Sequence, residues 1–265
     1  MTLDPVERHA RNAALLDDRT VVVPGYPGSG AALVGKLLAE LGLDYFDPYT
    51  EDLRSDGSVA QPGDDLDGYR RRLDPVPGAG GDGGPRFVKT HRYPREFAAV
   101  PLRAVVLLVR DPRDAIHSYY QWRLGFSEEG ERGSFAEFLA RPGPDGTPVQ
   151  DWTAFNAAWS ACPAPISTVL RFEDLKSDPA AAMAKVLTTL GLAVDEARLA
   201  EACRRSSFDS MRAHEDAVAG GDSRRIMRKG QVGEWRQWLT GPLAVPFAEP
   251  SLWAVAGAHG YSINP

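Results

Sequence analysis

The chain has 265 residues, of which 43% are hydrophobic and 25% are charged, and its formal net charge is −6. This length can bury one sizeable core, so we expect a single domain over residues 1–265. The apolar runs are too short to span a membrane, and the polar N-terminus lacks the apolar region of a secretory signal. Cys162 and Cys203 have no metal-ligand spacing, which favours a reduced, cytoplasmic protein without a metal site.

Positive charge is concentrated in two segments despite the acidic total. Residues 86–123 carry eight Lys or Arg against three Asp or Glu, and residues 222–236 carry five against two. The acidic total makes non-specific nucleic-acid binding unfavourable. The basic segments are consistent with a small polyanion held between them, or with two solvated charged faces.

The first periodic element is TVVVPG at residues 20–25, an apolar, β-branched run typical of a buried parallel strand. The turn GYPGSG and a helical pattern over residues 31–43 follow it. Gly28, Ser29 and Gly30 let backbone amides approach an anion closely, because little or no side chain stands in the way. Strand, turn and helix together therefore predict a phosphate cradle.

Residues 52–85 are rich in Gly, Pro and Asp, and this composition predicts a mobile loop or lid at 52–85. The next strand lies within PRFVKTHRYP and presents Lys89 and His91 side by side. A fully apolar strand over residues 104–109 then ends at Arg110, and a helix opens with Asp111 and Pro112. An arginine in this place is typical of an anion site, and Lys89 and His91 would supply the chemistry beside it.

The remaining elements alternate between helix and strand. Short helical patterns occupy residues 134–140 and 151–161, and PISTVLRFEDL predicts a strand that runs into a turn. A helix begins at Asp178 and ends at Gly191, and another covers residues 195–208. The alternation predicts a three-layer, P-loop-like α/β fold with a mostly parallel central sheet.

Ligands of such folds bind beyond the carboxyl ends of the strands, so we expect the glycine turn, the Lys89 and His91 pair and Arg110 to converge. The other histidines, His9 among them, are expected to be surface or structural residues. Four tryptophans are expected in the core: Trp152, Trp159, Trp235 and Trp238.

Five motifs in this order make the chain similar to the cytosolic-type sulfotransferases, which use 3′-phosphoadenosine 5′-phosphosulfate (PAPS). GYPGSGAAL resembles the family's 5′-phosphosulfate loop, FVKTHRYP its catalytic strand, and VRDPRDAIHSYYQW its 3′-phosphate segment. LRFEDLKSDP resembles the turn near adenine, and SSFDSM with IMRKGQVGEW resembles the C-terminal closure over the nucleotide.

The resemblance implies a role for each matched residue. His91 matches the general base that takes the acceptor proton, and Lys89 matches a lysine that supports the transferring sulfonyl group. The implied nucleotide contacts are Gly28, Ser29, Gly30, Ala31 and Ala32 in the loop, Arg110, Ser118, Arg228, Lys229 and Gly230 at the 3′-phosphate, and Phe172, Ser207 and Phe208 near adenine.

The loop departs from the family pattern. The family carries a lysine at the position of Gly28, threonines at Ala31 and Ala32, and a tryptophan at Leu33. Loss of the loop lysine leaves Lys89 as the main local cation. We therefore expect a lysine restored at position 28 to compensate partly for loss of Lys89, provided that the turn does not need a positive φ there.

The sequence thus predicts an enzyme that moves a sulfonyl group from PAPS to a hydroxyl of a small-molecule acceptor by in-line displacement, releasing adenosine 3′,5′-bisphosphate (PAP) without a metal. Two alternatives are a P-loop nucleotide kinase, against which Ala31 and Ala32 count, and a non-catalytic nucleotide-binding relative. The Ala-, Arg-, Gly- and Pro-rich composition is like that of high-GC bacteria, in which such enzymes often modify secondary metabolites. The family's C-terminal dimer motif is poorly matched, so we do not predict that dimer.

Overall fold

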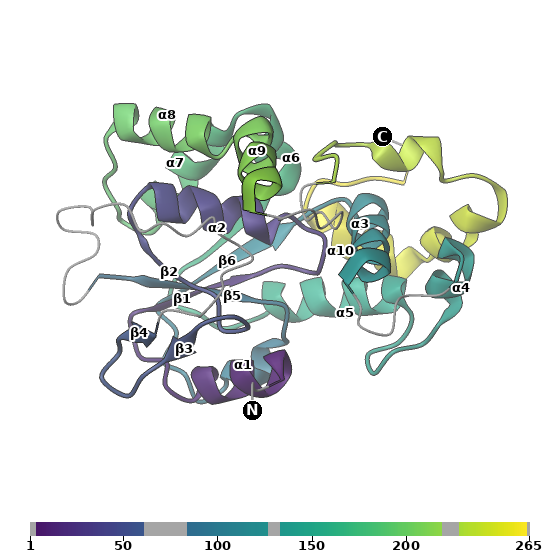
Figure 1. Cartoon of the computed structure of the whole chain (residues 1–265). Coiled ribbons are helices and arrows are strands. Elements are labelled where there is room, and N and C mark those ends of the chain that lie inside the picture. The colour runs from purple at the N-terminus through teal and green to yellow at the C-terminus, as the bar shows by residue number, and fades with distance from the viewer. Residues whose placement is uncertain (1–3, 61–83, 127–132, 219–227, 264–265) are drawn as a thin grey trace.

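A five-stranded parallel sheet forms the centre of the molecule (Figure 1). The computed structural model describes residues 4–60, 84–126, 133–218 and 228–263. The strands lie in the order β2-β5-β1-β6-β7, and every neighbouring pair is parallel. Their bounds are β1 Thr20–Pro24, β2 Asp44–Phe46, β5 Arg86–Thr90, β6 Ala104–Val109 and β7 Ser167–Arg171. The predicted α/β fold with a mostly parallel central sheet is confirmed.

Helices cover both faces of this sheet, which explains the continuous apolar runs of its central strands. Alternate residues of β6 serve opposite faces: Ala104, Val106 and Leu108 join one core, and Val105, Leu107 and Val109 join the other. The first core is completed by α2 (Ala31–Glu40), α7 (Pro179–Thr189) and α8 (Glu196–Arg205). The second is completed by α3 (Pro112–Phe126), α4 (Phe135–Ala140), α5 (Pro148–Ser160) and α10 (Pro250–Ala258).

Several helices begin at side-chain caps that are readable in the sequence. Asp178 accepts a hydrogen bond from the amide of Ala181 at the start of α7, and Thr147 forms a capping box with Gln150 at the start of α5.

The other helices are α1 (Pro5–Ala13), α6 (Phe172–Ser177) and α9 (Phe208–Val218), with 3₁₀ segments at Pro94–Phe97, Glu234–Gln237 and Gly241–Ala248.

The structure differs from the sequence-based expectations in several places. Helices α1, α9 and α10 and strand β2 were not predicted, and the loop expected at 52–85 starts with a hairpin of β3 (Asp52–Leu53) and β4 (Val59–Ala60) in which Leu53 is buried. Residues 61–83 lie outside the described residues, so the lid remains a prediction. Of the four tryptophans expected in the core, Trp152 and Trp159 are fully buried.

The other two tryptophans are half-buried, and each packs on a polar side chain. Trp235 lies 3.5 Å from the guanidinium of Arg113, and Trp238 stacks on His117 with ring centroids 4.8 Å apart. Across the described ranges, every helix is too short or too polar to cross a membrane.

Candidate active site

The glycine turn joins β1 to α2, and its backbone is shaped by glycine at two positions. Gly28 has a φ of +86° and Gly30 a φ of +99°, in the left-handed region that favours glycine. A Cβ at Gly28 would fall well inside 3.0 Å of the Ala115 carbonyl oxygen, and one at Gly30 would lie 2.5 Å from the ring of Phe172. Both positions therefore exclude side chains for conformational and packing reasons.

The amides at the start of α2 complete this turn. Gly30 occupies the N-cap of α2 and brings no side-chain acceptor, and Ala31 and Ala32 form the first helical turn. The hydroxyl of Ser29 is buried and has no hydrogen-bond partner among the described residues. Backbone donors and a hydroxyl with no partner are features of a site that receives an anion.

His91 lies immediately after β5, beside the first glycine of the turn. Its Nδ1 lies 2.6 Å from the carbonyl oxygen of Gly25, which requires Nδ1 to carry the proton and leaves the lone pair on Nε2. Burial and the nearby Lys89 ammonium lower the pKa of His91 to about 4. The imidazole is therefore neutral near pH 7 and can accept a proton.

Lys89 lies on β5, two residues before His91, and is paired with a residue that the sequence analysis missed. Its Nζ lies 2.9 Å from a carboxylate oxygen of Asp47, whose side chain is 1% exposed. The Lys89 side chain is 19% exposed. Asp47 follows β2, the edge strand next to β5, so the pair connects neighbouring strand ends.

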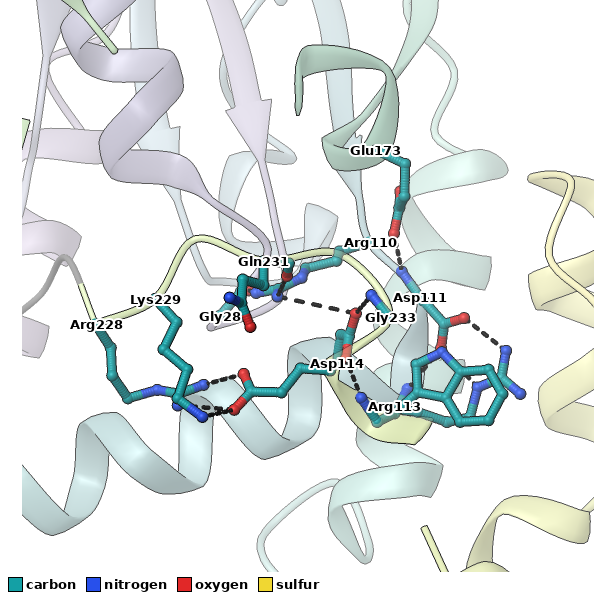
Figure 2. Close-up of polar contacts among 12 residues, drawn as sticks. Gly28, Arg110, Asp111, Arg113, Asp114, Glu173, Arg228, Lys229, Gln231 and Gly233 are labelled. Carbon is teal, nitrogen blue, oxygen red and sulfur yellow. Dashed lines mark hydrogen bonds and ion pairs between the residues drawn. The ribbon is translucent and has the colours of Figure 1, made fainter. Parts of the chain in front are cut away.

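Arg110 joins the glycine turn to the C-terminal part of the chain (Figure 2). Its guanidinium donates to the carbonyl oxygen of Gly28 at 2.8 Å and to that of Gln231 at 2.9 Å. It also lies 4.3 Å from the centre of the Phe172 ring. Asp114 adds a second connection by accepting hydrogen bonds from the amides of Gly233 and Trp235.

The two cations predicted to bind a 3′-phosphate converge, but on a carboxylate of the chain itself. Arg228 contacts both carboxylate oxygens of Glu234, at 2.9 and 2.5 Å, and Lys229 contacts one of them at 2.7 Å (Figure 2). These cations lower the pKa of Glu234, which is 5% exposed, to about 2. The two side chains thus hold one carboxylate of the chain itself.

The remaining predicted residues surround the same turn and segment. Ser118 packs beside Gly28, and Phe172 is buried against Gly30. A Cβ at Gly230 would lie 2.7 Å from the ring of Phe208, so those two residues are also in contact. Ser207 is exposed and its hydroxyl accepts the amide of Ser210 at the start of α9. Among the described residues, no hydrogen bond or ion pair joins Lys89 or His91 directly to Arg228 or Lys229. The glycine turn connects the two groups, because Gly25 contacts His91 and Gly28 contacts Arg110.

Three partners of the predicted site residues were missed by sequence reasoning: Asp47, Glu234 and Tyr49, whose hydroxyl accepts the backbone amide of His91. Glu234 lies in the quoted motif IMRKGQVGEW, six residues after Arg228, a separation that does not by itself indicate an ion pair. Asp47 and Tyr49 lie in FDPYTED, whose Asp-Pro pair indicates a turn but gives no indication of its contacts.

A family model for the sulfotransferase domain matches residues 18–248. The chain belongs to this family. Sulfotransferase 1E1 of Cavia porcellus is 25% identical over 168 residues, which are 59% of this chain and 57% of that protein. Mouse sulfotransferase 2A1 is 27% identical over 177 residues, covering 59% of each chain. The chain therefore matches less than two thirds of the length of these curated relatives.

Two solved structures are similar in fold to nearly the whole length of this chain. Mouse sulfotransferase SULT7A1, crystallised with PAP, has a TM-score of 0.69 at 17% identity and covers 98% of this chain and 95% of its own. Retinol dehydratase, crystallised with androsterone and the inactive cofactor PAP, has a TM-score of 0.62 at 19% identity and covers 99% and 88%.

We expected a lysine at position 28 to compensate for loss of Lys89 only if the turn did not need a positive φ there. Gly28 has a positive φ, so we no longer expect this compensation. We expect Gly28→Ala, and still more Gly28→Lys, to lower the free energy of unfolding in chemical denaturation. Gly191→Ala is the matched control: its φ is +71°, and nothing lies within 4 Å of the added Cβ. That control should cost about 1–2 kcal/mol for the backbone alone. Equal losses at positions 28 and 191 would contradict the steric contact with Ala115.

The Glu234 cluster predicts a specific acid dependence of stability. A carboxyl whose pKa is about 2 in the folded protein and near 4.5 otherwise stabilises the fold above pH 4.5. That contribution is lost as the pH falls toward 2. Glu234→Gln should therefore flatten the decline in unfolding free energy between pH 5 and 2. Glu201→Gln, which breaks an exposed pair with Arg204, should change the slope less. Equal slopes in wild type and Glu234→Gln would refute the depressed pKa.

Proposed function

We propose that this protein is a PAPS-dependent sulfotransferase that acts on a hydroxyl of a small-molecule acceptor. The observation that carries the proposal is the 2.6 Å contact between His91 Nδ1 and the Gly25 carbonyl. This contact places a neutral imidazole beside the glycine turn, which would hold the phosphosulfate. Membership of the sulfotransferase domain family supports the same chemistry.

The residues present suit a nucleotide with phosphates at both ends. The amides of the glycine turn and the buried Ser29 hydroxyl offer donors for the phosphosulfate. Arg228 and Lys229, which already hold a carboxylate, would hold the 3′-phosphate, with Arg110 and Ser118 beside the turn. Phe172, Ser207 and Phe208 would lie near adenine.

The proposed reaction is an in-line displacement in which His91 manages the proton. PAPS supplies an electrophilic sulfur joined through oxygen to a phosphate leaving group. Nε2 of His91 takes the acceptor proton as the acceptor oxygen forms its bond to sulfur. The bond from sulfur to the bridging oxygen breaks, and its electron pair leaves with PAP. The ammonium of Lys89 would stabilise the negative charge that grows on the bridging oxygen. The glycine turn has no lysine side chain to share this role.

The proposal favours sulfonyl transfer over phosphoryl transfer. A P-loop kinase needs a lysine and a hydroxyl residue at the start of the helix to hold the phosphates and Mg²⁺. In this chain α2 begins with Ala31 and Ala32, whose methyl side chains cannot bind phosphate or Mg²⁺. We infer cytoplasmic activity from the reduced cysteines, and no metal is required.

The nucleotide assignment predicts a difference between two ligands. PAP should raise the melting temperature more than adenosine 5′-monophosphate, because only PAP can engage Arg228 and Lys229. A ligand at a hundred times its Kd stabilises the native state by about 2.7 kcal/mol. Lys229→Ala should reduce the difference, whereas Arg204→Ala, in an exposed pair elsewhere, should preserve it. Equal shifts with both nucleotides would contradict the 3′-phosphate assignment.

The assignment of the base is tested by His91→Ala. Single-turnover transfer from PAPS to a hydroxyl acceptor, found by screening a panel by mass gain, should fall by roughly 10²–10⁴-fold. PAP binding should stay near that of wild type, because the nucleotide contacts lie elsewhere. His259→Ala is the control, since His259 pairs with Ser160 outside the site. Near-normal transfer by His91→Ala would remove this residue from the mechanism.

A further inference from the structure

The turn that follows β2, residues 47–51, is built around the carboxylate of Asp47. One oxygen of this carboxylate accepts the amide of Tyr49 at 3.0 Å, and the amide of Asp47 donates to Glu51 at 2.8 Å. The other oxygen contacts the ammonium of Lys89. Contacts within the turn therefore hold the Asp47 carboxylate in place, and this carboxylate in turn holds the Lys89 ammonium.

Tyr49, in the same turn, contacts His91 in two ways. Its hydroxyl accepts the backbone amide of His91 at 2.9 Å, just beyond the last β2–β5 pair, Phe46 with Val88. Its ring stacks on the imidazole, with centroids 5.7 Å apart and planes 29° apart. The same ring lies 5.8 Å from Nζ of Lys89. One side chain thus contacts both groups to which the proposed mechanism assigns chemistry.

Helix α1 supports this turn from outside the residues that match the family model. His9 is completely buried, in contrast to a surface histidine, and its ring centroid lies 4.8 Å from that of Tyr49. Its Nε2 lies 3.0 Å from the hydroxyl of Thr90, the last residue of β5. That hydroxyl also accepts the amide of Arg92, so α1 is connected to the chain on both sides of His91.

We propose that the turn at residues 47–51 positions the reactive pair of this enzyme: Asp47 holds the ammonium of Lys89, and Tyr49 holds the backbone and ring of His91. Both are positioning residues, because they act through Lys89 and His91. The inference rests on the proposed sulfonyl transfer and deepens it. A lysine has large rotamer freedom, and a fixed carboxylate removes that freedom before the substrates bind.

The decisive variant is Asp47→Asn, which keeps the shape and removes the charge. The matched control is Asp44→Asn, which breaks the 2.8 Å ion pair with Arg86 between the same two strands, β2 and β5. Tyr49→Phe is a second test of the turn: it removes only the hydroxyl and retains the ring. Thermal unfolding would verify that each variant is folded.

In single-turnover transfer, Asp47→Asn and Tyr49→Phe should each lose rate by on the order of 10-fold to 10²-fold, as expected for a misplaced reactive group. PAP affinity should change little, and Asp44→Asn should resemble wild type. In the Lys89→Met background, Asp47→Asn should cause no further loss, because Asp47 acts through Lys89. Additive losses would assign Asp47 a general structural role and overturn the proposal.

A second readout needs no substrate: the titration of the His91 ring, followed by NMR in ligand-free protein. Asp47→Asn should lower the His91 pKa, because it removes a negative charge that favours the imidazolium. Lys89→Met should raise it, and Asp44→Asn should leave it unchanged. The groups that face this ring are Lys89 from β5, Asp47 and Tyr49 from the turn, His9 from α1 and the Gly25 carbonyl.

The two readouts separate the two proposals. If wild type transfers no sulfonyl group, the proposed function fails, while the NMR titration still decides whether Asp47 and Lys89 control the charge at His91. If transfer occurs but Asp47→Asn and Tyr49→Phe match Asp44→Asn in rate and titration, the positioning role is overturned and the function stands.

Discussion

One buried guanidinium fixes the geometry on which the rest of this site depends. Arg110 leaves the central strand β6 with a side chain that is 7% exposed, and it donates to the carbonyl oxygens of Gly28 and Gln231. Withdrawing such a charge from water is costly unless its hydrogen bonds are replaced. The two carbonyls replace two of these hydrogen bonds, and the carboxylate of Asp114 at 4.0 Å and the face of Phe172 offset part of the charge. Nε of Arg110 is buried and has no hydrogen-bond partner among the described residues. The same side chain connects the glycine turn, the sheet and the C-terminal segment at Gln231.

Local patterns predicted most of the sheet, because its central strands are long enough to show their burial. The run at residues 104–109 is apolar throughout, and the structure buries it on both faces. Strand β2 escaped prediction because three residues are too few to show a period, and its place is decided by pairing with β5 across 42 residues of sequence. Helix α1 was missed because its buried residues include His9 and Asn12, which are polar. Their burial depends on tertiary partners that the local pattern does not contain.

The site divides in the same way between local and distant information. Lys89, His91 and Arg110 could be predicted together, because the carboxyl ends of parallel strands meet at one edge of a sheet. The conformation of Gly28 could not be predicted, since it depends on the approach of α3 to the turn. Asp47 could not be assigned to Lys89 either, because an acidic residue in a turn is most often solvated. The contact of Gly28 depends on α3 and that of Asp47 on the pairing of β2 with β5, so both are properties of the tertiary fold.

Three carboxylates lie beside the cations of the candidate site, and they show how an acidic protein can concentrate cations without a bare positive surface there. Each described cation of the site has a carboxylate nearby: Asp47 for Lys89, Asp114 for Arg110, and Glu234 for Arg228 and Lys229. Four cations of the two basic segments, Lys89, Arg110, Arg228 and Lys229, are thus paired with carboxylates, whereas Arg95, Arg103 and Arg236 of the same segments are exposed. A phosphate that bound Arg228 and Lys229 would have to displace the carboxylate of Glu234 from them. The phosphate could compete because it carries up to two negative charges and the carboxylate carries one. Net charge along the chain cannot describe such a site, because its selectivity depends on which anion each cation prefers.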